Sequence, residues 1–324
     1  MKKVLVTGGA GYIGSVLVKL LLDKGYFVRV LDNLSFGGEA IVELLNNNMF
    51  DFIKGDIRNR QDLEKAMKDI DYVAHLASIV GDPACAIDPE LTKDINIVGA
   101  KLTYQVANEM GIKKFIFAST CSNYGKMADP SSYVDEESEL KPVSLYAETK
   151  VEFEKYLLSQ SKSNTAKPTC LRFSTVYGLS PRIRFDLTVN EFTKDLAMGK
   201  ELVVFGEQFW RPYCHVVDLS RGVIAAIESD DDIVAFNVYN VGDTTENYQK
   251  QMIVDEIKKQ LPDAKIKYVK KDEDPRDYRV SFEKIKKELN FKVTKKVPDG
   301  IRDFIKVIQD GFINDPDSSK YKNI

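Results

Sequence analysis

The sequence predicts an α/β protein with a doubly wound parallel sheet and a smaller α/β domain interleaved in its second half. Short apolar runs alternate with longer helical stretches through residues 1–178, as strands and helices do in βαβ units. A glycine-rich turn follows the first apolar run. The chain has 324 residues, 44% hydrophobic and 29% charged, so it can form one large globular domain or two smaller ones.

The elements of the first domain follow from local composition. Residues 2–7, Lys-Lys-Val-Leu-Val-Thr, are mostly apolar or β-branched and predict a short buried strand. The stretch from Ser15 to Lys24 is an apolar helical run that ends at Gly25. The same alternation predicts strands at 26–32, 50–54, 72–76, 114–119 and 169–174, and helices at 60–68, 92–110 and 145–160.

The alternation weakens after residue 178, where Gly178-Leu-Ser-Pro181 interrupts the pattern. We expect a helix near 188–198, a strand at 201–205, and a mixture of helices with a strand near 265–269 in the remainder. We therefore assign residues 1–178 to the first domain, with a return segment at 213–240, and residues 179–324 mainly to a smaller lid domain. The polar tail from Asp315 is expected to be loosely held or docked on the surface.

Bulk composition excludes several classes of partner. The net charge is −3 with no basic block, so we expect no nucleic-acid partner. The four cysteines have no C-x-x-C spacing, which argues against a disulfide framework or a metal site and favours a reducing cytoplasm. Both histidines adjoin apolar runs and are interpreted as core residues. No apolar run reaches membrane-spanning length and no signal peptide is expected, so we expect no membrane partner.

The turn after the first strand has the spacing of a dinucleotide-binding site. Gly8, Gly11 and Gly14 form G-x-x-G-x-x-G between a predicted strand and a predicted helix. Glycines let the backbone approach a pyrophosphate, which the helix N-terminus attracts. Asp32 ends the second strand, where a carboxylate can accept ribose hydroxyls and would repel a 2′-phosphate, so NAD is favoured over NADP. The competing interpretations are an ordinary glycine connection and a strand-end turn at Asp32-Asn33.

Other residues at strand ends are candidates for cofactor contacts. Asp56-Ile57 follows the third strand and could hold the adenine edge, and Leu76-Ala77-Ser78 would pass under the cofactor. Asn96 opens the next helix, and an ordinary helical role competes evenly there. The full cofactor-binding set is Gly8, Gly11, Tyr12, Ile13, Gly14, Asp32, Asn33, Asp56, Ile57, Leu76, Ala77, Ser78, Asn96, Ser119, Tyr146, Lys150, Ser174 and Val176.

Tyr146 and Lys150 are four residues apart, so a helix places both on one face. A free tyrosine has a pKa near ~10 and needs a cationic neighbour to act as a base at neutral pH. Chance alone would supply such a spacing in a chain of this composition. Its meaning therefore depends on the dinucleotide motif that precedes it.

Taken together, these pieces resemble the extended short-chain dehydrogenase/reductases of the nucleotide-sugar epimerase and dehydratase group. The matching segments, in the family's order, are 7–14 (Thr-Gly-Gly-Ala-Gly-Tyr-Ile-Gly), 32–33, 55–57, 75–77, 119–120, 124–125, 146–150, 211–218 (Arg-Pro-Tyr-Cys-His-Val-Val-Asp) and 274–278 (Asp-Pro-Arg-Asp-Tyr). The resemblance implies a Rossmann domain that binds NAD, a lid domain that binds a nucleotide-diphosphate sugar, and a homodimer.

The resemblance also implies catalytic roles. Tyr146 would be the general base, Lys150 would bind the nicotinamide ribose and lower the tyrosine's pKa, and Thr120 would hydrogen-bond the reacting sugar hydroxyl. The family's 4,6-dehydratases carry an Asp-Glu pair after the threonine, where this chain has Cys121-Ser122. Its 3,5-epimerases have a reactive cysteine at the position of Ser122, and we expect Cys121 to be structural.

The remaining machinery fits a C4 epimerase. A C4 dehydrogenase or 4-keto reductase is the alternative within the chemistry. A catalytically silent NAD-binding sensor or scaffold is the alternative of another class, although the intact Thr120, Tyr146 and Lys150 argue against it.

Substrate contacts are expected mainly in the second half, because arginine forks suit a diphosphate. Arg211 and Arg276 fall where the resemblance places diphosphate contacts. A solvated loop competes for Arg182 and Arg184. The full substrate-binding set is Thr120, Thr175, Arg182, Arg184, Asn190, Arg211 and Arg276.

The helices at 92–110 and 145–160 carry apolar residues on several faces. In the resembling family such a pair packs on its mate in a homodimer, and burial against the chain's own sheet is the alternative. The residues concerned are Ile97, Leu102, Val106, Phe153, Tyr156 and Leu157.

Overall fold

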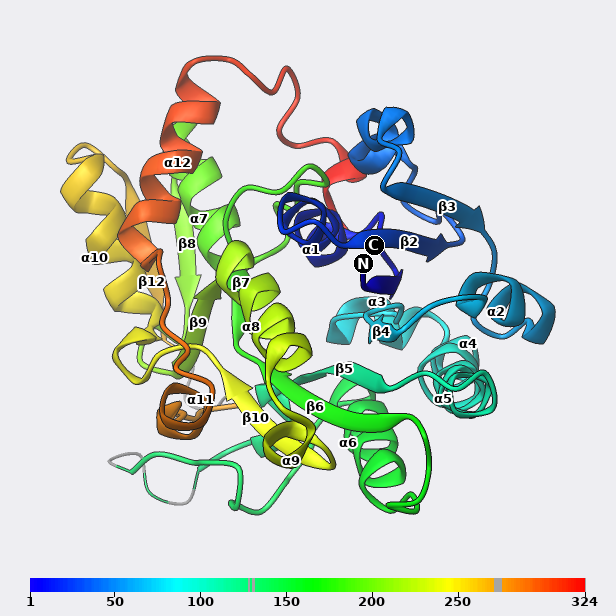
Figure 1. Ribbon diagram of the computed structural model, residues 1–324. Helices are drawn as coiled ribbons and strands as arrows, with labels where there is room; N and C mark the ends of the chain where they lie inside the picture. Colours follow the sequence, from blue (N-terminus) through cyan, green and yellow to red (C-terminus); the bar gives the residue numbers. More distant parts are fainter. Residues whose placement is uncertain (128, 130–131, 271–275, 324) are drawn as a thin grey trace.

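The computed structural model describes residues 1–127, 129, 132–270 and 276–323, and it confirms the predicted α/β class. The described chain is built on a seven-stranded sheet in the order β10-β6-β5-β4-β1-β2-β3, and all neighbouring strands are parallel (Figure 1). The strands are β1 (Lys3–Thr7), β2 (Phe27–Asp32), β3 (Phe50–Lys54), β4 (Tyr72–His75), β5 (Lys114–Thr120), β6 (Lys167–Phe173) and β10 (Asn237–Val241).

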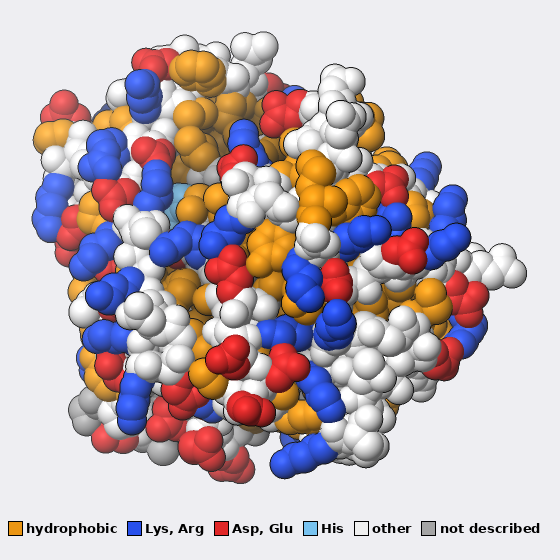
Figure 2. Space-filling view, in the orientation of Figure 1, with side chains coloured by type: hydrophobic (Ala, Val, Ile, Leu, Met, Phe, Trp, Pro, Cys, Tyr) orange, Lys and Arg blue, Asp and Glu red, His pale blue; other side chains and the backbone are white. Residues whose placement is uncertain are grey.

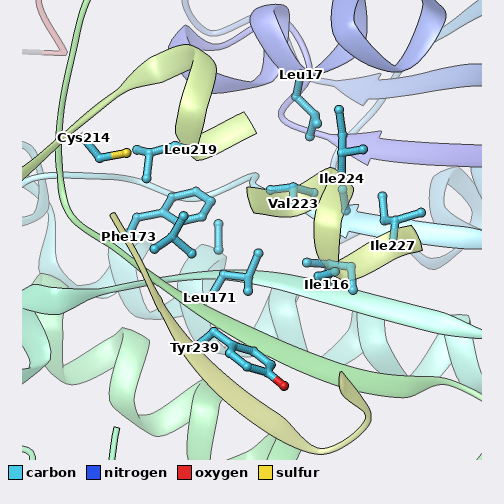
Figure 3. Close-up of a cluster of buried hydrophobic side chains, with 14 of the residues drawn as sticks. Leu17, Ile116, Leu171, Phe173, Cys214, Leu219, Val223, Ile224, Ile227 and Tyr239 are labelled. Carbon is cyan, nitrogen blue, oxygen red and sulfur yellow. The ribbon is translucent and has the colours of Figure 1, made fainter. Parts of the chain in front are cut away.

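Helices cover both faces of this sheet. One face packs against α1 (Tyr12–Asp23) and α8 (Val216–Glu228), and the other against α2 (Arg60–Met67), α5 (Ala100–Glu109) and α6 (Leu145–Leu158). Side chains alternate between the faces along each strand. Val4 and Val6 of β1 therefore join the α1–α8 core, whereas Leu5 joins the opposite core. Figure 3 shows part of the first core, where Leu171 and Ile116 of the sheet face Val223 and Ile224 of α8.

The smaller region lies beside one end of the sheet (Figure 1). It contains a parallel pair, β8 (Leu202–Phe205) with β12 (Ile266–Val269), and a three-stranded sheet of β7 (Thr175–Tyr177), β9 (Trp210–His215) and β11 (Asn247–Gln249). The helices α7 (Thr188–Ala197), α10 (Lys250–Gln260) and α12 (Val297–Gln309) share its apolar core. Between β9 and β11 the chain returns to the main sheet through α8, α9 (Asp231–Val234) and β10.

The predicted helix at 92–110 is three segments, because α4 (Pro89–Lys93) leads into a π-helical turn at Asp94–Gly99 before α5 begins. The turn carries Asn96, whose amide bonds the backbone of Ile79. Such π-turns are often found at functional sites. Elements that we did not predict include α3 (Asp82–Ile87) and 3-10 helices at Glu39–Asn46, Cys121–Tyr124, Thr244–Glu246 and Ser319–Tyr321, whereas α11 (Glu283–Glu288) lies where a mixture of helices was expected.

The apolar faces proposed for dimer contacts divide into two groups. Val106, Phe153 and Leu157 are buried in the core between the helices and the sheet, which is the alternative we allowed for them. Ile97, Leu102 and Tyr156 are half-buried. The homodimer thus stays a prediction that depends on the second group.

Surface and core features bear on the other expectations. Both histidines lie in the core, and His215 also caps α8 by accepting from the Val217 amide. Acidic and basic side chains are interspersed on the face shown in Figure 2. Within the described ranges no helix has the length and apolar character that a membrane span requires, and no three His, Cys, Asp or Glu side chains cluster as metal ligands would.

Candidate active site

The three candidate catalytic residues meet at the carboxyl end of β5. Thr120 is the last residue of β5, and its hydroxyl accepts a 3.1 Å hydrogen bond from the Ser122 amide. Tyr146 and Lys150 lie one turn apart on α6, which begins after Ser144 caps the Ala147 amide. The threonine side chain also lies near enough to Tyr146 to oppose the rise in the pKa of the phenol that burial causes. This arrangement holds a phenol and a hydroxyl together at the edge where ligands bind in open parallel sheets.

Lys150 is held by groups beneath it. Its Nζ donates a 2.9 Å hydrogen bond to the Ala118 carbonyl oxygen and lies 4.9 Å from the centre of the Phe117 ring. The same atom lies 5.8 Å from the centre of the Tyr146 ring. The ammonium is therefore beside the tyrosine without forming a direct hydrogen bond to it.

Burial disfavours the charged forms of both Tyr146 and Lys150. The pKa of Tyr146 is therefore raised in the ligand-free protein, whereas the sequence-based expectation was that Lys150 lowers it. Burial raises the pKa of Tyr146, and the Cys85 thiol adds to that effect. The Thr120 hydrogen bond and the Arg184 guanidinium act in the opposite direction without cancelling it. Burial also lowers the pKa of Lys150 to about 7. In the protein by itself the pair is therefore driven towards neutral phenol and neutral amine, rather than towards phenolate and ammonium.

A buried ionic network lies behind the catalytic strand. Glu154, one turn beyond Lys150 on α6, forms a 2.5 Å ion pair with Arg172 of β6, and both side chains are almost inaccessible. The Ser119 hydroxyl donates to Glu154 at 2.8 Å, so this side chain points into the network and not towards a cofactor. Cys121 is buried and donates to the Arg172 carbonyl oxygen, as expected for a structural thiol. The sequence-based reasoning missed Glu154 and Arg172.

The glycine turn forms an open backbone cradle. Gly8 has φ +74°, and a Cβ there would lie 2.8 Å from the Ala77 amide nitrogen. A Cβ on Gly14 would lie 2.2 Å from the Gly8 carbonyl oxygen. The helix α1 starts at Tyr12 with no side-chain cap and no acidic residue in its first turn. Its first N–H groups are thus left for an external anion, which fits the pyrophosphate of a dinucleotide.

Asp32 is fixed at the end of β2. Its Oδ2 accepts from the Ala10 amide at 2.9 Å and its Oδ1 from the Leu34 amide at 2.8 Å. Burial nevertheless raises its pKa. Each carboxylate oxygen retains a lone pair, so the geometry is compatible with an adenosine ribose.

Several predicted cofactor residues have protein partners instead. Ile57 is buried in the helix–sheet core, and Asp56 pairs with Arg58 at 2.7 Å, which lowers the pKa of Asp56. The Asn96 amide oxygen accepts from Ser78 and Ile79, and its nitrogen donates to Ile79 and Thr149. These side chains brace the loops of the site, and their backbones remain the part available to a ligand.

Four more of the predicted cofactor residues also have partners within the protein. The Asn33 amide oxygen accepts from Ser35, and the Ser174 hydroxyl donates to the Val241 carbonyl oxygen. Leu76 packs at the edge of the sheet core, and Val176 packs in a small cluster with Tyr12 and Ile13.

Tyr12 and Asn190 join α1 to the second half. The Tyr12 hydroxyl donates to the Gly178 carbonyl oxygen and accepts from Asn190 at 3.1 Å. Asn190 also accepts from the Gly178 amide and donates to the Arg184 carbonyl oxygen. Its side-chain oxygen and nitrogen therefore both have partners within the fold, and its assignment as a substrate ligand stays a prediction. Arg184 itself pairs with Asp186 at 2.7 Å.

Burial raises the pKa of Tyr278, and Arg211 and Arg276 both act to lower it. Arg211 stacks 5.3 Å from the centre of the Tyr278 ring, and the Tyr278 hydroxyl lies 3.4 Å from the Ser122 Oγ. Arg276 forms a 2.7 Å ion pair with Asp82. Asp274 and Pro275, which completed the matching segment, lie outside the described residues.

The last two residues of the predicted substrate-binding set, Thr175 and Arg182, have other surroundings. Thr175 is half-buried at the start of β7, paired with Tyr213. Arg182 faces the C-terminal segment instead.

The unpredicted helix α3 adds two groups to the electrostatics of the site. Asp82 and Cys85 both raise the pKa of Tyr146. The signal that could have revealed this helix is Pro83 at its N-terminus, directly after an aspartate.

Comparison with known proteins decides the family. The model of the NAD dependent epimerase/dehydratase family matches residues 4–242. The chain belongs to this family. It is 30% identical to UDP-glucose 4-epimerase 2 of Arabidopsis thaliana over 93% of each chain. It is also 30% identical to the UDP-glucose 4-epimerase of Bacillus subtilis, over 75% of this chain and 77% of that protein.

Solved structures agree with the sequence comparison. UDP-glucose 4-epimerase of Thermotoga maritima, solved with UDP-glucose, has a TM-score of 0.85 and 28% identity, covering 96% of this chain and 100% of that one. UDP-glucuronic acid 4-epimerase of Bacillus cereus, solved with UDP-glucuronic acid and NAD, has a TM-score of 0.83 and 28% identity, covering 95% and 99%. These findings confirm the resemblance stated from the sequence, the Rossmann-like fold, the NAD cofactor and an enzyme of the nucleotide-sugar epimerase/dehydratase type.

Proposed function

We propose that this protein is a nucleotide-sugar 4-epimerase that acts on a UDP-hexose. The observation that carries the proposal is the composition of the site: Thr120, Tyr146 and Lys150 meet at the end of β5, and positions 121–122 offer no carboxylate. A 4,6-elimination needs an additional acid–base pair, whereas reversible oxidation of one alcohol does not. The named relatives and neighbours that act on UDP-sugars at C4 support the choice of reaction and nucleotide.

The chain's own residues would handle the proton. Tyr146 removes the proton of the C4 hydroxyl as the C4–H bond breaks, and it returns that proton to O4 when the C–H bond re-forms on the other face. Thr120 hydrogen-bonds O4 and fixes its distance from the phenol. Arg184 supplies positive charge that favours the phenolate, and a protonated Lys150 would add to it, against the desolvation that raises the pKa of Tyr146. When bound, NAD accepts the hydride and gives it back.

Substrate orientation would depend on the second half of the chain. Arg211 and Arg276 are the proposed diphosphate ligands, because both act to lower the pKa of Tyr278, whose hydroxyl lies 3.4 Å from the Oγ of Ser122, two residues after the catalytic threonine. The Asp82 partner of Arg276 would have to share or release that guanidinium. Residues 1–178 with 213–240 would form the NAD-binding domain and the remainder the substrate-binding lid. A homodimer through the faces of Ile97, Leu102 and Tyr156 completes the proposal.

The test is a panel of UDP-, GDP-, CDP- and dTDP-sugars incubated with NAD and followed by proton NMR and by absorbance of reduced cofactor. We expect inversion at C4 for a UDP-hexose with no net reduction of NAD. Tyr146→Phe should lower turnover about 10²–10⁴-fold. The matched control is Tyr26→Phe, since the Tyr26 hydroxyl donates to Glu228 at the exposed end of α8.

Other outcomes would select the alternatives. Accumulating reduced cofactor would indicate a C4 dehydrogenase, and NAD binding without turnover of any sugar would indicate a sensor or scaffold. Wild-type turnover by Tyr146→Phe would refute the assigned base.

A further inference from the structure

The C-terminal segment is docked on the loop that follows β7. The Phe185 amide donates to the Tyr321 carbonyl oxygen at 2.8 Å, and the two rings meet edge to face. Asp317 pairs with Lys194 at 2.8 Å and with Lys200 at 2.6 Å. The docked alternative expected for the tail is therefore the one found. These contacts give the last residues a defined position on the loop at 180–186.

Arg182 is the centre of this contact. Its Nη1 donates to the Asn323 Oδ1 at 2.5 Å and its Nη2 to the Lys322 carbonyl oxygen at 3.0 Å. The guanidinium lies 4.2 Å from the centre of the Phe36 ring. The residue is only 8% exposed, yet its Nε–H is buried without a hydrogen-bond partner. A buried guanidinium donor left unpaired costs stability.

The surroundings of Arg182 indicate which ligand site this contact supports. The Ser180 hydroxyl donates to the Tyr12 carbonyl oxygen at 2.6 Å and lies 3.1 Å from the Ser15 hydroxyl, so the loop is tied to the uncapped start of α1. The Arg182 amide donates to the same Ser180 hydroxyl. Phe36, on the other side, belongs to the loop that begins after Asp32. Arg182 therefore bridges the two segments that fit the pyrophosphate and the adenosine ribose of NAD.

We propose that Arg182 is a cofactor-positioning residue, and that Lys322 and Asn323 of the C-terminal segment hold it over the adenosine–pyrophosphate half of NAD. It would act through the segments that it joins, because its buried Nε–H has no accessible surface by which a phosphate could reach it. This assigns Arg182 to the cofactor and not to the sugar nucleotide, unlike the sequence-based expectation. The C-terminal segment then acts as a strap that slows cofactor release.

Cofactor retention matters for the proposed reaction. An epimerase must return its hydride to the same sugar, so the reduced cofactor has to stay bound until the second half-reaction is complete. A strap that reaches from the chain's end to the α1 turn supplies that retention at a distance from the reacting carbon. The inference itself needs only the NAD cofactor, so it does not depend on which sugar is turned over.

The experiment measures the dissociation rate of NADH by stopped-flow fluorescence, together with the NAD content of the purified protein. Arg182→Gln, and separately deletion of residues 315–324, should raise the rate about tenfold or more, because each removes a charged hydrogen-bonding group or its support. Asn323→Ala removes one contact and should raise it about threefold. The matched control is Lys320→Ala, an exposed tail residue whose ammonium lies 4.8 Å from the centre of the Tyr321 ring, and it should release NADH at the wild-type rate.

The affinity for UDP is measured on the same variants. Wild-type NADH release from folded Arg182→Gln and Asn323→Ala would overturn the proposal. A loss of UDP affinity with unchanged NADH release would instead return Arg182 to the substrate site. Far-UV circular dichroism checks that the variants fold, and Asn323→Ala keeps the test decisive if the larger changes unfold the chain. A negative sugar panel would refute the proposed epimerase without affecting this result.

Discussion

Replacing Lys150 by methionine should stabilise the ligand-free protein at neutral pH while abolishing catalysis. The side chain is only 4% exposed, and its Nζ lies against the Ala118 carbonyl oxygen, the Phe117 ring and the Tyr146 ring. Burial lowers its pKa from the ordinary 10.5 to about 7. Burying this amine therefore lowers the free energy of unfolding at every pH at which the amine is protonated in the unfolded chain.

The sign and size of the effect of Lys150 on the free energy of unfolding follow from proton linkage. Between pH 7 and 10.5 the unfolded state holds the proton and the folded state does not, so Lys150 makes stability rise with pH across this window. Below pH 7 both states are protonated and the cost is constant. A shift of about 3.5 pKa units at about 1.36 kcal/mol each gives an upper limit of about 5 kcal/mol. Methionine leaves the Ala118 carbonyl oxygen without its donor, which offsets about 1–2 kcal/mol, so we expect a gain of about 3 kcal/mol at pH 7.

The assay is urea unfolding of wild-type and Lys150→Met protein, both stripped of NAD because a bound ligand would add stability. The difference in unfolding free energy should be largest at pH 7 and shrink towards pH 10. Lys155→Met, at an exposed position of the same helix, should show no such pH-dependent difference. A Lys150→Met protein that is less stable than wild type at pH 7, or a difference that does not change with pH, would refute the reasoning.

Two further predictions concern stability. Glu154→Gln should lower the free energy of unfolding by about 3–5 kcal/mol, because Arg172 is left charged and buried without its carboxylate. The double variant Glu154→Gln with Arg172→Met should lose less stability, because no buried charge is left unpaired. Equal losses for the two variants in urea unfolding would argue against this. Gly178→Ala should cost more than about 2 kcal/mol, because its φ is +110° and the added Cβ would lie 2.2 Å from the His215 Nε2. Gly25→Ala, with φ +82° and open space around it, should cost only about 1 kcal/mol in the same thermal or urea measurement.

Much of the sheet could be predicted because its signals are local. The strands β1 to β6 lie within a few residues of their expected positions, because each apolar run and each helical stretch can be recognised from its own residues. The short α3 and the π-turn of Asp94–Gly99 were missed, because six residues carry too little periodicity to separate them from a loop or a longer helix. Those two elements bring Asp82 and Cys85 towards Tyr146 and Asn96 towards the Ile79 loop, so part of the site was missed with them.

The sequence by itself determined the parallel α/β class, the dinucleotide turn and the one-turn spacing of Tyr146 and Lys150. Each of these depends on residues close together in the chain, where backbone geometry sets the outcome. Only the tertiary structure decided that burial would neutralise that pair, because a pKa depends on everything packed around the group. Only folding, likewise, could bring Asn323 to Arg182, since the partner of a long-range contact is selected by packing and not by spacing along the chain.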